Sequence, residues 1–220
     1  MRTLTHETRA ALSPADVLRV LLAGNARFAN NLKANRDLQL QVQATAQGQY
    51  PSAVVLSCMD SRTSAELVFD QGLGDLFSIR IAGNIVSPDV LGSMEYAVAA
   101  AGVKLVLVLG HTACGAIAGA CEKVRMGNLT GTLERIAPAI RRVPAGADPA
   151  TYKDRVAAAN VCVSIDDILA QSPIIRQRLA SGEVGLAGAM YNVATGVVQV
   201  MNACAFVHQA VPQAAMVAID

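Results

Sequence analysis

Two short segments of the chain carry side chains that could bind a metal. In VVLSCMDSR, Cys58, Asp60 and Arg62 alternate directly after an aliphatic run. In VLVLGHTACG, His111 and Cys114 follow a similar run. Thiolate sulfur and imidazole nitrogen are ligands that Zn²⁺ prefers, and three of them leave a fourth tetrahedral position open. The spacing therefore predicts a zinc site made by Cys58, His111 and Cys114.

Asp60 and Arg62 follow Cys58 at every second position. Alternate side chains of an extended segment point to the same side, so all three can face one cavity. Asp60 is the natural candidate for the fourth metal position, either as a ligand or as the group that guards it. The guanidinium of Arg62 would hold this carboxylate bidentately and keep it ionised. Without a metal, Asp60 would be a helix N-cap and Arg62 an exposed first-turn charge.

A parallel sheet can position these side chains. Short aliphatic segments, typical of buried strands, alternate along the chain with longer segments of helical spacing. This alternation predicts an α/β fold, with a mostly parallel sheet of four to five strands covered by helices. Ligands bind at the carboxyl ends of such strands, where Cys58 and His111 can converge. The expected strands are residues 52–58, 75–82 and 104–111, and the expected helices are 64–72, 90–102 and 114–127.

The N-terminal part is predicted to be helical. Ser13, followed by a proline, predicts the start of a helix that runs to Leu32. This helix belongs to an N-terminal helical arm, residues 1–48, and an α/β zinc core follows over residues 49–220. We expect the arm and the core to form a single domain, because the one loop-like break, RRVPAGADPA, is too short to separate two.

The C-terminal part is predicted to add two helices and a hairpin. The segment VGLAGAMYNVATGVVQVM, residues 184–201, reads as two strands around a turn at residues 194–196. This hairpin is expected to extend one edge of the sheet. The two helices before it are expected over residues 148–172 and 173–183.

The composition limits the classes of partner. A net charge of +1 and 16% charged residues do not provide the basic surface that nucleic acid requires. No apolar run approaches about 20 residues, and the N-terminus carries charges throughout, so neither a membrane span nor a secretory signal is expected. The sequence therefore predicts a soluble, cytoplasmic protein that acts on small neutral or singly charged molecules.

The cysteines point to metal or catalytic use. An odd number, five, is scattered in apolar segments of a chain with no expected secretory signal, which argues against a disulfide framework. Cys121, Cys162 and Cys204 are expected to pack in the core. His6 and His208 are expected at the surface, not at a metal.

The two motifs resemble those of the β-class carbonic anhydrases. CMDSR matches the Cys-x-Asp-x-Arg motif of that family, and HTACG matches its His-x-x-Cys-Gly motif. The segments RIAGN, SMEYA and GAMYNVATG extend the resemblance over nearly the whole chain. It implies reversible hydration of carbon dioxide to bicarbonate and a proton, by a hydroxide on one zinc ion per subunit. It also implies zinc ligation by Cys58, His111 and Cys114, with Asp60 and Arg62 as a dyad that orients the hydroxide and gates the metal.

The resemblance also implies a substrate pocket. Gln49, nine residues before the first motif, matches the substrate-binding glutamine of the family. Phe77 and Tyr96 match apolar positions that wall the carbon dioxide pocket, and in the family Tyr96 comes from a second chain. Ala82 replaces a larger aliphatic residue, and Gly115 completes the pocket. The expected assembly is therefore a homo-oligomer, a dimer or a tetramer.

Two other functions fit the same residues. One is a hydrolase of carbonyl sulfide or carbon disulfide, whose metal site would look alike. The other is a non-catalytic zinc module, in which Asp60 is a permanent fourth ligand and the metal only stabilises the fold. Gln49 and Arg62 argue against the second function, because a structural site needs neither.

Overall fold

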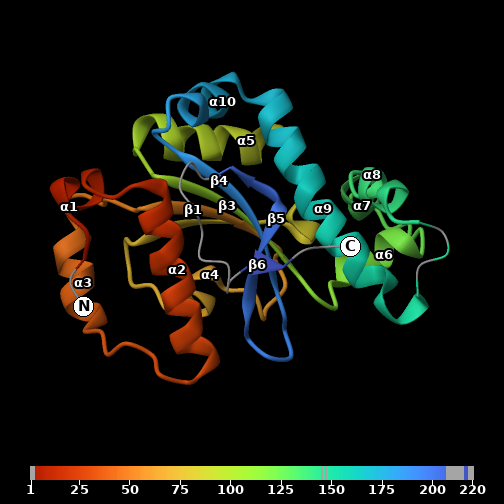
Figure 1. The fold of residues 1–220 in the computed structure, drawn as a ribbon, viewed down its shortest axis with the longest axis horizontal. Helices are drawn as coiled ribbons and strands as arrows, with labels where there is room; N and C mark the ends of the chain where they lie inside the picture. Colours follow the sequence, from red (N-terminus) through yellow and green to blue (C-terminus); the bar gives the residue numbers. More distant parts are fainter. Residues whose placement is uncertain (1–2, 145, 147, 207–215, 218–220) are drawn as a thin grey trace.

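The centre of the fold is a mostly parallel β-sheet (Figure 1). The computed structural model describes residues 3–144, 146, 148–206 and 216–217. The strand order is β2-β1-β3-β4-β5-β6, with β4 and β5 antiparallel. The predicted parallel sheet with a C-terminal edge hairpin is confirmed, and the short strand β6 adds to it. The strands are β1 Ala53–Ser57, β2 Leu76–Arg80, β3 Leu105–His111, β4 Gly185–Tyr191, β5 Val198–Phe206 and β6 Met216–Val217.

Helices cover both faces of the sheet, because successive strand residues point to opposite sides. Val54 and Leu56 pack against α5, η2, α9 and α10, whereas Ala53 and Val55 pack against α2 and α4. A third apolar cluster, with α6, α7 and α8, lies at the carboxyl end of the strands. The helices are α1 His6–Ala10, α2 Pro14–Ala29, α3 Leu38–Thr45, α4 Ala65–Val68, η1 Ala82–Asn84, α5 Pro88–Glu95, η2 Tyr96–Ala100, α6 Gly115–Cys121, α7 Leu129–Glu134, α8 Ala137–Arg142, α9 Pro149–Gln171 and α10 Pro173–Ala180.

The sheet register brings the two metal-binding motifs together. β1 and β3 are adjacent parallel strands, in which Ser57 pairs with Leu109. Cys58 follows β1 directly, and His111 is the last residue of β3. The two side chains therefore leave the sheet at the same edge, as the sequence predicts.

The start of the N-terminal helix is confirmed at its N-cap. The Ser13 hydroxyl accepts a hydrogen bond from the Asp16 amide at 3.2 Å. The helix ends at Ala29, before the predicted Leu32, because Asn31 adopts a left-handed φ of 56°. The helical part of the segment before residue 49 is thus divided among α1, α2 and α3.

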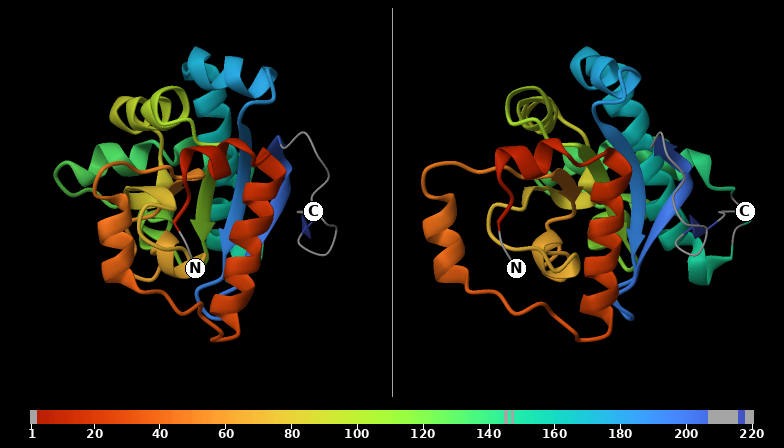
Figure 2. Two further views of the ribbon diagram at one scale, coloured as in Figure 1. Left: turned by 90° about the vertical axis from the view of Figure 1, so that its left-hand side faces the viewer. Right: turned by 60° about the vertical axis from the view of Figure 1, so that its left-hand side comes forward.

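The third helix of the arm, α3, lies at the outer side of the molecule, apart from α2 (Figure 2). The connection between them is held by the buried carboxylate of Asp70. It pairs with Arg27 at 2.6 Å and with Arg36. The division of the chain into an arm and a core within one domain stays a prediction.

The long helix expected after the second motif, over residues 114–127, is wrong. α6 ends at Cys121, and Lys123 has a φ of 56°, in the left-handed region that often follows a helix end. α7 and α8 then follow in a stretch where the sequence predicts no helix. Each has six residues, too few to show a clear helical period.

Two other helices differ in extent from their predictions. The helix expected over residues 90–102 begins at Pro88 and becomes a π-helix at Tyr96. The helix expected over residues 64–72 is limited to the four residues of α4. Within the described part of the chain, no helix is long and apolar enough to cross a membrane. The cytoplasmic location stays a prediction.

Candidate metal centre

Three buried side chains converge at the carboxyl edge of the sheet. The Cys58, His111 and Cys114 side chains offer ligand atoms that all lie within 4.8 Å of one another. The Sγ atoms of Cys58 and Cys114 are 3.9 Å apart. The three residues are 3%, 1% and 4% exposed. The fold therefore brings together the three residues whose spacing predicts a metal site.

Local backbone structure aims each ligand at this point. Cys58 and His111 lie where β1 and β3 end, and Cys114 is the N-cap residue of α6. Between His111 and Cys114, Ala113 has a φ of 52°, which turns the chain sharply. The amide of Gly83 donates to the Cys58 sulfur at 3.4 Å. One strand-to-helix turn thus supplies two of the three ligand atoms.

The ring of His111 is oriented as a metal ligand. Its Nδ1 lies 2.9 Å from the carbonyl oxygen of Thr112, so this nitrogen carries the proton and donates. Nε2 therefore presents a lone pair. This atom is buried and has no hydrogen-bond partner among the described residues. A buried acceptor without a donor is costly unless a cation meets it.

The side chains of Cys58 and Cys114 are hydrogen-bonded to each other. The hydrogen bond from Cys114 lowers the pKa of Cys58 to about 4, against the opposing effect of burial. The pKa of Cys114 is raised, because its hydrogen bond to Cys58 and its own burial both favour the neutral thiol. A metal cation bound by both sulfurs would satisfy them as thiolates.

Asp60 faces Arg62, not the three ligands. Arg62 Nε donates to Asp60 Oδ1 at 2.9 Å, and Arg62 Nη2 donates to Oδ2 at 2.8 Å. These bonds hold the pKa of the Asp60 carboxyl well below its usual range. Asp60 is not a helix N-cap, because α4 begins at Ala65 after Ser64. The group of possible metal ligands contains the two thiols and the imidazole, without Asp60.

Arg80 is a residue whose part in the site the sequence analysis did not assign. Its Nη2 donates to the backbone carbonyls of Met59 at 3.1 Å and Asp60 at 2.6 Å. Its Nε donates to the carbonyl of Cys58 at 3.3 Å. Arg80 ends β2 and pairs in register with Ser57, so its place beside the first motif was a usable signal.

Comparison with known proteins shows the family to which this chain belongs. A family model described as carbonic anhydrase matches residues 53–198, which include all three ligands, Asp60 and Arg62. The chain belongs to the β-carbonic anhydrase family. It is 36% identical over 193 residues to carbonic anhydrase 2 of Mycobacterium tuberculosis, which covers 84% of this chain and 91% of that protein. The recognised family and the predicted enzyme class, a carbonic anhydrase, are confirmed.

Solved β-carbonic anhydrases share the fold. A structure from Aspergillus fumigatus has a TM-score of 0.69 at 25% identity, over 90% of this chain and 94% of that one. Tetrameric β-carbonic anhydrases from Sordaria macrospora match with a TM-score of 0.66 at 25% identity, over 86% and 98% of the two chains. The α/β architecture is therefore that of the β-carbonic anhydrase family.

A cavity of about 460 Å³ opens beside the metal-binding group of this β-carbonic anhydrase. It is lined by Cys58 and Asp60, and also by Ala82 and Gly115, two of the residues expected around substrate. The rest of its wall is mainly apolar and comes mostly from α6, α7 and the loop between them. A small uncharged molecule would therefore meet an apolar wall on one side and Asp60 beside Cys58 on the other.

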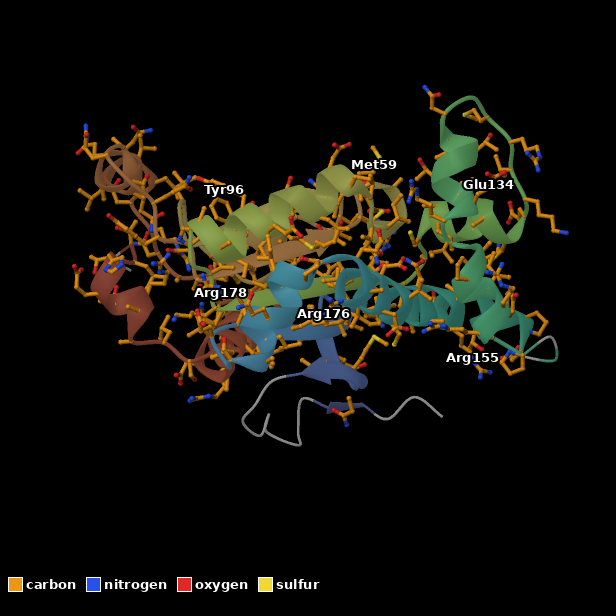
Figure 3. The ribbon with its side chains drawn as sticks, turned by 90° about the horizontal axis from the view of Figure 1, so that it is seen from above. Met59, Tyr96, Glu134, Arg155, Arg176 and Arg178 are labelled. Carbon is orange, nitrogen blue, oxygen red and sulfur yellow. The ribbon has the colours of Figure 1, made fainter. Side chains whose placement is uncertain are left out.

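The other three residues expected around substrate lie elsewhere in the same chain. Phe77 and Tyr96, with ring centroids 6.2 Å apart, line a groove of about 830 Å³ beside β2. Figure 3 shows Tyr96 and Met59 on the same side of the molecule, separated along α5. Gln49 is exposed and precedes β1, whereas Cys58 follows that strand. The five residues of β1 span about 17 Å, and Gln49 lies before them. Gln49 is therefore far from the metal site of its own chain.

Among the side chains that the structure describes, no other cysteine or histidine joins the site. Cys121 is free and half-buried, and it packs against the third cluster as expected. Cys162, on α9, packs against the apolar cluster that contains Val54 and Leu56, as expected, but it is also disulfide-bonded, which the sequence did not predict. An odd total of cysteines still allows one pair. His6 is exposed, edge-on to a tyrosine ring. The side chains of Cys204 and His208 lie outside the described residues.

Proposed function

We propose that this carbonic anhydrase holds one zinc ion per subunit through Cys58, His111 and Cys114. The convergence of three buried donor atoms within 4.8 Å carries this proposal. Two sulfurs at about 2.3 Å from a tetrahedral zinc lie about 3.8 Å apart. The observed separation of Cys58 and Cys114 is 3.9 Å. The unpaired Nε2 of His111 supplies the third ligand atom.

The proposed reaction is the reversible hydration of carbon dioxide to bicarbonate and a proton. Zinc, when bound, lowers the pKa of a coordinated water to around 7 and so makes a nucleophile available. Asp60 accepts a hydrogen bond from the attacking oxygen and orients its remaining lone pair toward the carbon. Arg62 keeps Asp60 ionised, a role supported by the lowered pKa of that carboxyl. Ala82 and Gly115 border the cavity that receives carbon dioxide.

Asp60 also acts as a gate in this proposal. Paired with Arg62, it leaves the fourth metal position free; turned to the metal, it would close the site. The pairing at 2.8–2.9 Å supports the open arrangement. It weighs against a non-catalytic zinc module, which would need Asp60 as a permanent ligand.

We propose further that a second copy of the chain completes each site. Gln49, Phe77 and Tyr96 do not line the cavity beside their own metal group, so we propose that they serve that of a partner. β2 is an edge strand, and Tyr96 beside it is 60% exposed. The arm also exposes apolar side chains on α3 at Leu38 and Leu40. Such surfaces favour association into a homodimer or tetramer, and the Sordaria macrospora relatives are described as tetrameric.

Stopped-flow carbon dioxide hydration with metal analysis, from pH 6 to 9, tests the proposal. We expect one zinc per subunit and hydration that increases with pH, because hydroxide competes with Asp60 for the fourth position. Zinc-loaded protein that does not hydrate carbon dioxide would contradict the proposal. Turnover of carbonyl sulfide or carbon disulfide in place of carbon dioxide would support the hydrolase instead.

A further inference from the structure

The turn between two of the proposed zinc ligands has an unusual backbone. Thr112 and Ala113 separate His111 from Cys114, and Ala113 has a φ of 52°. Residues with a Cβ rarely adopt this left-handed region, so surrounding contacts must hold it. The conformation of Ala113 decides where Cys114 points.

Ala113 is held from both sides by charged side chains. Its amide donates to the Asp154 carboxylate, at 2.9 Å, from α9. Its carbonyl accepts a hydrogen bond from Arg62 Nη2 at 3.2 Å. One residue thus connects α9, the dyad and the metal-binding loop.

Thr112, the residue before Ala113, is bound to a different part of the fold. The Thr112 amide donates to the carbonyl of Tyr191, at 3.0 Å, and the Thr112 hydroxyl accepts from the amide of Val193 at 3.1 Å. These bonds fasten Thr112 to β4 and the residues after it, but they leave the rotation at Ala113 free. Among the ion pairs of the described residues, none includes Asp154, so its carboxylate is available to the loop.

We infer that Asp154 is a positioning residue for the metal centre, an inference that rests on the proposed function. Its hydrogen bond holds Ala113 in the left-handed turn that brings Cys114 to the metal and the Ala113 carbonyl to Arg62. Without this acceptor the turn relaxes toward negative φ. Cys114 then moves away from the metal, and Arg62 loses one of the groups that hold it beside Asp60.

A general tether between α9 and the loop is the competing explanation. The neighbouring Lys153 provides a matched control, because it also joins α9 to this region. Its ammonium pairs with Glu122, just after α6, at 2.6 Å, and both side chains are about half exposed. Lys153→Ala removes that tether but leaves the Ala113 turn untouched.

The test compares zinc release from loaded protein to an excess of a coloured chelator. We expect Asp154→Ala to release zinc at least tenfold faster than wild type, and Lys153→Ala to stay within twofold of it. Asp154→Asn is expected between them, because the amide oxygen can accept the same hydrogen bond without the charge. Cobalt(II) absorption spectra should show a distorted site in Asp154→Ala alone.

A second variant separates the turn from overall folding. Glycine adopts positive φ without the penalty that alanine has. Adding Ala113→Gly to Asp154→Ala should therefore slow zinc release back toward wild type. If Asp154→Ala does not fold, the same addition to Asp154→Asn serves. Failure of Ala113→Gly to slow release in either background would overturn the inference.

The outcomes also separate this inference from the proposed function. Equal release rates in Asp154→Ala and Lys153→Ala, in protein that binds zinc and hydrates carbon dioxide, would overturn the inference and leave the proposed function standing. A wild-type chain that binds no zinc would overturn both.

Discussion

The Arg62 guanidinium holds the Asp60 carboxylate by two hydrogen bonds and also reaches the metal-binding loop. The two bonds measure 2.9 and 2.8 Å, and a third, from Arg62 Nη2 to the carbonyl of Ala113, measures 3.2 Å. The dyad is thus connected to the turn between His111 and Cys114. A change at Arg62 is therefore expected to affect both the carboxylate and the site it guards.

Arg62→Ala should retain zinc but lose activity. It removes the partner that draws Asp60 away from the fourth metal position, whereas the three ligands remain. We expect carbon dioxide hydration to fall at least tenfold, about 1.4 kcal/mol of barrier. Stopped-flow rates and zinc content of the same preparation measure this. Arg142→Ala, which breaks a surface pair with Asp166, is the control. Unchanged hydration in Arg62→Ala would reduce Arg62 to an ordinary surface charge.

The Asp60 carboxyl should titrate below its ordinary range. The hydrogen bonds from Arg62 lower its pKa in the folded protein, so the pair stabilises the fold above the ordinary pKa of about 3.9. That contribution is lost as the pH falls through the lower folded value. Carboxyl ¹³C chemical shifts should give a midpoint below 3.9 in wild type and one nearer 3.9 in Arg62→Ala. Identical midpoints would show that the pairing is absent in solution.

The ionisation of Asp60 does not account for the pH dependence of activity. Between pH 6 and 9 Asp60 stays ionised in both proteins, since even its ordinary pKa lies well below this range. A rise of activity over that interval therefore cannot come from deprotonation of Asp60.

Cys114→Ser should lose zinc, whereas Cys121→Ser should keep it. Cys114 is buried with its sulfur 3.9 Å from that of Cys58, but Cys121 lies seven residues on, half-buried and outside the group of possible ligands. Zinc per subunit after gel filtration, by elemental analysis, checks this. Equal loss in the two variants would place the ligand on the wrong cysteine.

Tyr96→Ser should weaken the proposed dimer and its activity together. The Tyr96 side chain is 60% exposed beside the edge strand β2, where a second copy would cover it. Met126→Ser is a matched control, because Met126 is 64% exposed on another part of the surface. Sedimentation and specific activity across a dilution series measure the effect. Full activity in a dilute monomer would rule out a site completed by a partner.

Asn25→Ala should destabilise the fold. The buried Asn25 amide donates to the carbonyls of Val68 and Gly196, at 3.0 and 2.8 Å, and accepts from the amide of Val198 at 2.8 Å. Its loss leaves three backbone groups unpaired, which costs about 3 kcal/mol of unfolding free energy. Asn30→Ala, which removes one exposed bond, should cost well under 1 kcal/mol. Chemical denaturation compares them; similar losses would contradict the role of Asn25.

The sequence by itself was sufficient for the local features. Aliphatic runs predicted β1, β2 and β3, because buried parallel strands need apolar side chains on both faces. Ser13 before a proline predicted the start of α2. Cys58, His111 and Cys114 were identifiable because soft ligands at strand ends have a specific spacing. Such signals depend only on residues that are close along the chain, so they can be read from the sequence.

Only the tertiary structure decided which side chains meet. The hydrogen bond from the Ala113 amide to the Asp154 carboxylate spans 41 positions, and no local sequence pattern predicts it. The sequence could name Gln49 as a pocket residue, but only the fold showed that it lies at the opposite end of β1 from Cys58. The pairing of Asp60 with Arg62, and not with the ligands, is likewise a matter of orientation. Spacing limits which residues can approach one another, whereas packing of the whole sheet and its helices determines their final distances and directions.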